Sequence, residues 1–129
     1  MRKKRLNNSK KRTALYDALR ASREHPSAEM LYGTLKSAIP ELSLATVYRN
    51  LSVLVSEGAA IPVGRVDGEI RYDAVTDPHP HFICRGCGRV MDLSLPDTVS
   101  GLVEQIDERD GCLADSCMLT FFGLCDRCR

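Results

Sequence analysis

Residues 79–92 read HPHFICRGCGRVMD, and within fourteen positions they hold two histidines, a Cys-x-x-Cys pair and an aspartate. A second Cys-x-x-Cys pair lies at the end of the chain, at Cys125 and Cys128. Thiolates, imidazoles and carboxylates are the side chains that bind transition metals, and the first group prefers softer ions than the last. The stretch therefore predicts two neighbouring metal sites, one made of thiolates and one made of imidazoles and carboxylates.

The two Cys-x-x-Cys pairs are separated by 37 residues and consist of Cys84, Cys87, Cys125 and Cys128. Each pair reverses the chain tightly, and Gly86 and Gly88 let the backbone approach the sulfur atoms. Four thiolates complete a tetrahedral Zn²⁺ site without an open position, so this site is structural. A thioredoxin-like redox pair is the alternative, but it expects one motif next to a βαβ pattern rather than two motifs in turns.

Two cysteines remain outside these pairs, Cys112 and Cys117. They are five residues apart on a predicted strand, where their side chains face opposite sides of the sheet. An internal disulfide is therefore not expected, and the pattern predicts buried or half-buried thiols.

The second predicted metal site begins with His79 and His81, which alternate along an extended segment and so point to one face. Asp92 lies on the neighbouring strand. Imidazoles and carboxylates without thiolates suit Fe²⁺, Mn²⁺, Co²⁺ or Zn²⁺. Two histidines at this spacing are equally compatible with ordinary surface residues, and composition alone does not bring His25 or Asp73 to them.

The hydropathy and the cysteine content indicate in which cellular compartment the protein is located. No apolar run approaches the roughly 18 residues that span a membrane, and the basic N-terminus lacks the apolar segment of a secretory signal. Six cysteines in a reducing compartment indicate metal ligands or redox chemistry rather than disulfides. We therefore expect a cytoplasmic protein without a membrane partner.

The net charge of +1 hides a difference between the halves of the chain. Residues 1–66 carry twelve Lys and Arg against five Asp and Glu, whereas residues 67–129 carry six against twelve. Such asymmetry is typical of a protein in which one half faces nucleic acid. Residues 1–12 are either a solvated tail or an arm that contacts DNA phosphates.

The hydrophobic pattern of residues 1–74 predicts three helices followed by a β-hairpin. The helices run from Lys10 to about Ser22, from Ser27 to before Pro40, and from Ser43 to Gly58. Strands at residues 59–66 and 69–75 meet at an Asp67-Gly68 turn. This order is a winged helix-turn-helix DNA-binding domain. The expected DNA contacts are Lys10, Lys11, Arg12, Ser43, Thr46, Tyr48, Arg49 and Asn50.

Residues 75–80 form the predicted hinge, and residues 81–129 form the second domain. Strands are expected at residues 81–84, 89–94 and 112–122, with a helix at residues 96–109. The fold class is therefore α+β, with an α/β dimerisation domain that carries the four-cysteine zinc site. The apolar helix face exceeds what so small a sheet can cover, which predicts a homodimer. This face consists of Val99, Leu102, Val103 and Ile106.

Several motifs together resemble the ferric uptake regulator (Fur) superfamily, and most closely its peroxide-sensing branch, PerR. The carriers include residues 25–29 (HPSAE), 43–51 (SLATVYRNL), 71–73 (RYD), 79–84 (HPHFIC) and 123–128 (GLCDRC). The resemblance implies a regulatory Fe²⁺ or Mn²⁺ site and one structural Zn²⁺ per chain. The regulatory ligands carried over are His25, Asp73, His79, His81 and Asp92.

The resemblance further implies a homodimeric, metal-dependent repressor that binds a double-stranded DNA operator, and not an enzyme with a small organic substrate. Aspartates at positions 73 and 92 favour the peroxide-sensing branch, because iron-uptake regulators tend to have glutamates there. A Fur-type iron, zinc or manganese uptake regulator is the alternative within the family. A redox enzyme and a purely structural zinc-ribbon nucleic-acid binder are the alternatives outside it.

Overall fold

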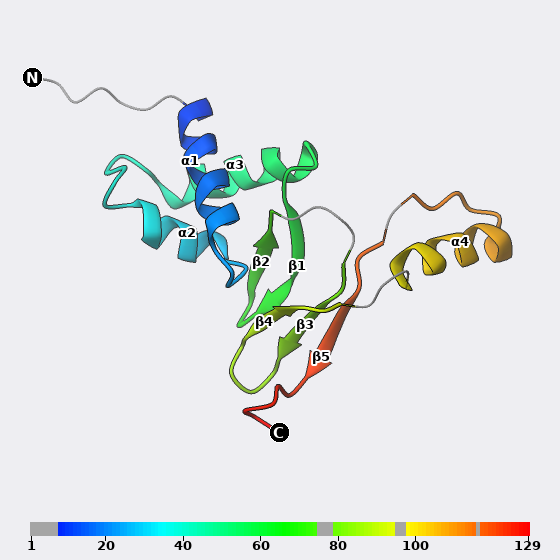
Figure 1. Ribbon diagram of the computed structural model, residues 1–129. Coiled ribbons are helices and arrows are strands. Elements are labelled where there is room, and N and C mark those ends of the chain that lie inside the picture. The colour runs from blue at the N-terminus through cyan, green and yellow to red at the C-terminus, as the bar shows by residue number, and fades with distance from the viewer. Residues whose placement is uncertain (1–7, 75–78, 95–97, 116) are drawn as a thin grey trace, which may run out of the picture. The chain divides into compact units, whose positions relative to one another are not determined.

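The computed structural model describes residues 8–74, 79–94, 98–115 and 117–129, with the backbone alone for residues 98–100, 107 and 108 (Figure 1). The chain divides into two compact units, Met1–Thr76 and Asp77–Arg129. We call them the N-terminal and C-terminal units and describe each separately. Most of the predicted hinge, residues 75–78, lies outside the described residues.

The N-terminal unit contains α1 (Asn8–Ala21), α2 (Ala28–Leu35) and α3 (Leu44–Ser56), followed by the antiparallel strands β1 (Ile61–Val66) and β2 (Glu69–Asp73) (Figure 1). The three helices pack on one another, and α1 and α2 also pack on β2. Side chains from the three helices and from β2 meet in one apolar core. It is built around Leu15, Leu19, Leu31, Leu42, Val47, Leu51 and Leu54.

Serine caps start two of these helices, as the sequence predicted. The Ser27 hydroxyl accepts a hydrogen bond from the Met30 N–H at 3.1 Å, and the Ser43 hydroxyl accepts one from the Thr46 N–H at 3.1 Å. Each cap satisfies a backbone donor that has no partner inside its helix. After α3, Gly58 adopts a φ of 75°, a conformation that stops a helix.

The hairpin turn is also confirmed, because Asp67 and Gly68 have φ values of 51° and 81°. Two successive positive φ values define the type I′ turn, whose twist matches that of antiparallel strands. A third extended segment joins this sheet from the loop between α1 and α2. Ser27 forms an isolated antiparallel bridge with Arg71, so the loop that carries His25 runs along β2.

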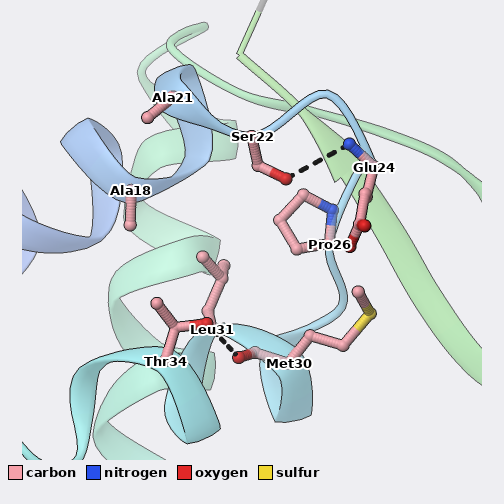
Figure 2. A pocket seen from close by; sticks show the side chains of 8 residues that line it. All are labelled: Ala18, Ala21, Ser22, Glu24, Pro26, Met30, Leu31 and Thr34. Atoms are coloured by element: carbon pink, nitrogen blue, oxygen red, sulfur yellow. Dashed lines mark hydrogen bonds between the residues drawn. The ribbon is translucent and has the colours of Figure 1, made fainter.

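That loop borders a hollow of about 300 Å³ between α1 and α2 (Figure 2). Ser22 holds the start of the loop by accepting a hydrogen bond from the Glu24 N–H at 3.2 Å. Figure 2 shows Pro26 and Glu24 on the loop, with Met30 and Leu31 entering from α2. The hollow is mainly apolar in its lining and belongs to the N-terminal unit.

The C-terminal unit contains β3 (His81–Cys84), β4 (Val90–Asp92), α4 (Thr98–Asp110) and β5 (Thr120–Gly123). The strand order is β4-β3-β5, with β4 antiparallel and β5 parallel to β3 (Figure 1). The prediction of a strand over residues 112–122 is wrong at its start, because β3 offers only four residues to pair with. The described residues between α4 and β5 belong to no regular element.

The C-terminal unit exposes several large apolar side chains. Leu102 and Ile106 of α4 are 40% and 46% exposed, and Phe121 and Phe122 of β5 are 41% and 48% exposed. The side chain of Val99 lies outside the described residues.

No helix in the described part of the chain is long and apolar enough to cross a membrane.

Candidate metal centres

The four cysteines of the two pairs meet in the C-terminal unit. Their sulfur atoms all lie within 4.8 Å of one another, and the Cys87 and Cys125 sulfurs are 3.8 Å apart. A tetrahedron with Zn–S bonds of about 2.3 Å has edges of about 3.8 Å. The cluster therefore has the dimensions of a four-thiolate zinc site. Its ligands come from the end of β3, the β3–β4 turn and the segment after β5.

Backbone geometry prepares this cluster for a cation. The N–H groups of Cys125 and Cys87 point at the Cys84 sulfur, at 3.4 and 3.5 Å, and lower the pKa of Cys84 to about 6. Hydrogen bonding to the neighbouring sulfurs, first that of Cys125, raises the pKa of Cys128 to about 12. Cys84 is therefore deprotonated more readily than Cys128, whose thiolate would need a cation to compensate its charge.

Gly86 is needed for this close packing. A Cβ atom at position 86 would lie 2.9 Å from both Cβ and Sγ of Cys128, which is closer than packed atoms approach. The glycine between the two cysteines therefore lets the last turn of the chain reach the β3–β4 turn.

A second group of possible metal ligands, one histidine and one aspartate, lies in the N-terminal unit. His25 Nε2 is 3.3 Å from Asp73 Oδ2, and the two side chains are only 7% and 8% exposed. Asp73 is the last residue of β2, and His25 lies in the loop that runs along this strand. Two ligands at right angles and about 2.1 Å from one ion lie about 3.0 Å apart. The pair is therefore spaced as two ligands of one cation.

A third set lies in the C-terminal unit, at the start of β3. Asp92 Oδ1 is 3.1 Å from His79 Nε2 and 3.3 Å from His81 Nε2. The cause is the strand register, because His81 and Asp92 are direct partners in the antiparallel pair of β3 and β4. The imidazole rings of His79 and His81 lie on the same side, with their centroids 4.3 Å apart. This confirms the prediction that alternate residues place both rings on one face.

The exposed face of α3 carries several of the predicted DNA contacts. Tyr48 and Arg49 are exposed, whereas Ser43 uses its hydroxyl to cap the helix and to contact the Thr46 hydroxyl at 2.8 Å. On α1, Lys10 is exposed, and Lys11 and Arg12 are half-buried. These positions leave Tyr48 and Arg49 as the large polar side chains that α3 presents to solvent.

The expectation that Asn50 faces DNA is wrong. Its side chain is 2% exposed, and its carbonyl oxygen accepts a hydrogen bond from Arg12 Nε at 3.3 Å. Asn50 follows Val47 by three residues and precedes Leu54 by four, so helical geometry places it on the buried face. Asn50 instead links α3 to α1, because its side chain is hydrogen-bonded to the Nε–H group of Arg12.

Sequence reasoning missed two residues that hold this unit together. Glu29 of α2 accepts a hydrogen bond from the Tyr48 hydroxyl, which lowers the pKa of Glu29 and raises the pKa of Tyr48 to about 12. Arg71 of β2 donates to the backbone of the His25 loop. Glu29 and Arg71 lie inside motifs, but their partners are 19 and at least 46 positions away, and no local pattern indicates such contacts.

The prediction that the two remaining cysteines are buried or half-buried thiols on a strand is also wrong. Cys112 and Cys117 are exposed rather than buried, and both precede β5 instead of lying on it. The Cys112 thiol contacts the Asp110 carbonyl oxygen at 3.7 Å, just after α4. Neither residue belongs to the four-thiol cluster.

The sequence matches the model of the ferric uptake regulator family over residues 3–122. The chain belongs to this family. The peroxide operon regulator of Bacillus subtilis is 34% identical over 119 residues, which cover 91% of this chain and 80% of that protein. The peroxide-responsive repressor PerR of Staphylococcus epidermidis is 31% identical over 120 residues, which cover 92% of this chain and 78% of that protein.

Solved structures of family members share the fold. The Campylobacter jejuni peroxide stress regulator superposes on this chain with a TM-score of 0.81 at 28% identity. The superposition covers 94% of this chain and 90% of the regulator. The family match contains the imidazole and carboxylate positions of both units, and it ends just before the second Cys-x-x-Cys pair. The thiolate cluster in the structure of this ferric uptake regulator family member therefore includes two ligands from beyond the matched residues.

Proposed function

We propose that this protein is a homodimeric, metal-dependent DNA-binding repressor of the peroxide-sensing type. The observation that carries the proposal is the pair of preassembled ligand sets, His25 with Asp73 in one unit, and two histidines with Asp92 in the other. Family membership and relatives named as peroxide regulators support the same assignment.

The four-thiolate cluster would hold Zn²⁺ as a permanent structural ion. Its ligands are all cysteines, so no open position remains for a substrate. Cys84 and Cys125 are buried, which shields the ion from exchange with solvent. In this proposal zinc keeps the C-terminal unit folded whatever the regulatory state.

The regulatory ion, Fe²⁺ or Mn²⁺, would be bound by His25, Asp73, His79, His81 and Asp92. This donor set contains nitrogen and oxygen atoms without sulfur, which suits both metals. Because the ligands belong to different units, binding of one ion would hold the units in a single arrangement. An ion that binds one arrangement in preference to others increases its population.

DNA binding is assigned to the N-terminal unit, read as a winged helix with α3 in the major groove. Tyr48 and Arg49 are exposed on α3, and an arginine can bind a guanine edge through two hydrogen bonds. Lys10, Lys11 and Arg12 on α1 are assigned to phosphate contacts, which add affinity without sequence preference. Two α3 helices in a dimer must match the spacing of two operator half-sites, so fixing the units would permit repression.

The C-terminal unit is assigned as the dimer interface. Leu102 and Ile106 of α4, and Phe121 and Phe122 of β5, are 40–48% exposed, and contiguous exposed apolar surface commonly marks a protein–protein interface. A second copy of the chain would cover this surface. The assignment is consistent with the small number of residues that the unit buries by itself.

Peroxide sensing would use the same ligands. When bound, Fe²⁺ would supply the reductive cleavage of peroxide. Overall, one peroxide oxygen would add to a coordinating histidine, His25 or His79, which loses two electrons, and the other oxygen would leave as water. Loss of either imidazole as a ligand would release the hold between the units and derepress the target. Each chain would respond once, so the event is sensing rather than turnover.

The decisive experiment is metal analysis of the anaerobically purified protein, followed by peroxide treatment and peptide mass spectrometry. We expect one tightly bound zinc per chain, a second exchangeable metal, and one added oxygen on His25 or His79 in the iron-loaded protein. The manganese-loaded protein is the matched control and should gain none. If the iron-loaded protein repressed normally without histidine oxidation, the protein would instead be a metal-uptake regulator.

The variant Asp92→Glu tests the branch directly. Asp92 Oδ1 lies 3.1 and 3.3 Å from the two imidazole nitrogens, so one added methylene must shift the carboxylate relative to both rings. We expect metal-dependent DNA binding to persist while histidine oxidation falls several-fold at equal peroxide. Equal oxidation in both proteins would argue against a role of this aspartate in sensing.

A further inference from the structure

The loop that carries His25 is fastened to β2 by one arginine. Nη1 of Arg71 donates hydrogen bonds to the carbonyl oxygens of Glu24 and His25, at 3.0 and 3.2 Å. The neighbouring Tyr72 N–H donates to the Pro26 carbonyl oxygen at 3.1 Å. Three consecutive carbonyl groups of the loop are therefore turned towards β2.

His25 needs this support because its backbone is in the left-handed region, with a φ of 54°. A side chain with a Cβ atom is disfavoured there, and the conformation persists only where the surrounding structure enforces it. The hydrogen bonds from Arg71 act on the two carbonyl groups that flank the His25 Cα atom. They therefore restrain both peptide planes that set the direction of the imidazole.

Strand β2 also contacts the imidazole ring of His25. Arg71 and Asp73 are two residues apart on β2, where alternate side chains share a face. Asp73 Oδ2 lies 3.3 Å from His25 Nε2. β2 thus contacts the backbone of His25 through Arg71 and the ring of His25 through Asp73.

We propose that Arg71 is a positioning residue for the regulatory metal: it presets the backbone of His25, so that Nε2 stands beside the Asp73 carboxylate before the ion arrives. This inference rests on the proposed function, because it takes His25 and Asp73 as ligands of the regulatory ion. Arg71 does not touch the ion itself, since a guanidinium has no lone pair to offer a cation.

Charge and geometry predict opposite effects of removing this arginine. A positive charge two residues from a metal ligand repels a cation, so its removal by itself would strengthen metal binding. Loss of the two hydrogen bonds would let the loop sample other conformations and weaken metal binding. The sign of the change in affinity therefore separates positioning from electrostatics.

The experiment is a titration of the zinc-containing full-length protein with Mn²⁺ alone, which avoids iron oxidation. The variants are Arg71→Gln, Arg71→Lys and the matched control Arg65→Gln. Arg65 is exposed on the partner strand β1 and donates to the Gly68 carbonyl oxygen at 3.3 Å, so its replacement removes the same charge from the same hairpin. Zinc content and the thermal midpoint report whether each variant is folded.

We expect Arg71→Gln to bind Mn²⁺ about 10- to 100-fold more weakly, the range that supporting partners of metal ligands typically show. Arg71→Lys keeps the charge but has a shorter, non-planar head, and its affinity should fall between those of Arg71→Gln and the wild type. Arg65→Gln should stay within about twofold of the wild type. Unchanged or tighter binding by a folded Arg71→Gln protein overturns the proposal.

A double-mutant cycle with His25→Ala separates positioning from a general loss of stability. It measures whether the loss of Mn²⁺ affinity caused by Arg71→Gln depends on the His25 side chain. If Arg71 acts through His25, adding Arg71→Gln to His25→Ala causes no further loss of Mn²⁺ affinity. A further loss as large as that in the wild-type background overturns the proposal. A wild-type protein that binds no Mn²⁺ beyond its zinc would contradict the proposed regulatory site itself, a result distinct from failure of Arg71 alone.

Discussion

The two units of this protein are stabilised in different ways. Among the described residues, twelve hydrophobic side chains are buried in the N-terminal unit and four in the C-terminal unit, and two of those four are cysteines of the thiolate cluster. The N-terminal unit therefore has an ordinary apolar core around Leu51 and Val47. The C-terminal unit has only a small apolar core, and under the proposed function it would be stabilised by metal at the thiolate cluster and by dimerisation.

This difference suits a sensor in which one part must stay constant. A domain with so few buried apolar residues normally needs a metal or a partner chain to fold. In the proposed function, a permanent ion at the thiolate cluster would supply that stability without using the imidazoles and carboxylates of the regulatory site. Under the proposed function, loss of the regulatory ion would then affect DNA binding while both units remain folded.

The largest expected effect comes from Cys84→Ser. Cys84 is 1% exposed, and its sulfur accepts hydrogen bonds from the N–H groups of Cys125 and Cys87, so the change removes the best-supported ligand of the cluster. Structural zinc binding supplies about 10–16 kcal/mol at neutral pH. We expect loss of zinc, unfolding of the C-terminal unit and a monomeric chain, as measured by metal analysis, limited proteolysis and size-exclusion chromatography.

Cys112→Ser is the matched control for that experiment. Cys112 is exposed and outside the cluster, so zinc content and oligomeric state should equal those of the wild type. The circular dichroism of α1, α2 and α3 should survive in both variants, because their core contains no cluster residue. Cooperative loss of all helices in Cys84→Ser would contradict the independence of the two units.

The second largest effect is expected from Leu51→Ala, which tests the other unit. Leu51 is 0% exposed in the core of α1, α2 and α3, and such truncations cost about 2–5 kcal/mol. Urea unfolding followed by circular dichroism should show this loss, with the zinc content unchanged. Release of zinc at the same urea concentration as helix unfolding, in both proteins, would show that the units unfold together.

The features that could be predicted from the sequence are those that depend on local chemistry. Ser27 and Ser43 start helices because a hydroxyl satisfies a donor three residues away. Asp67-Gly68 makes a hairpin because both residues tolerate a positive φ. The thiolate cluster was predictable because Cys-x-x-Cys fixes two ligands within one turn, whatever the rest of the chain does.

The features that could not be predicted depend on partners far away in the sequence. The length of β5 is set by β3, some forty residues earlier, so an apolar run alone overestimated it. The pairing of His25 with Asp73 depends on a loop that crosses to β2, and family resemblance rather than spacing suggested it. Asn50 is different, because helical periodicity already placed it with Val47 and Leu54 on the buried face.

A smaller effect is expected from Ser43→Ala at the start of α3. The change removes the hydrogen bond to the Thr46 N–H, and loss of a serine cap costs about 1 kcal/mol. Urea unfolding of the helices should shift by that amount, and zinc content and dimerisation should not change. Ser43→Asp, which preserves a capping oxygen, should recover most of the stability, and failure to do so would place the role of Ser43 elsewhere.

The smallest effect is expected from Tyr48→Phe, and it should depend on pH. The hydrogen bond to Glu29 lowers the pKa of Glu29 below its ordinary 4.5, so its contribution is complete above pH 4.5 and is lost as the pH falls through the folded value. The same bond raises the pKa of Tyr48 from 10.0 to about 12, so its contribution is complete below pH 10 and is lost as the pH rises towards 12.

The difference in urea stability between the wild type and Tyr48→Phe should therefore be constant between about pH 5 and pH 10 and shrink outside that window. Tyr16→Phe is the control, because the Tyr16 ring lies 5.5 Å from the Arg20 guanidinium rather than beside a carboxylate. A difference that persisted unchanged to pH 3 would mean that the phenol stabilises α3 by packing and not through Glu29. Because the affected groups belong to the N-terminal unit, zinc retention should follow the same pH profile in both proteins.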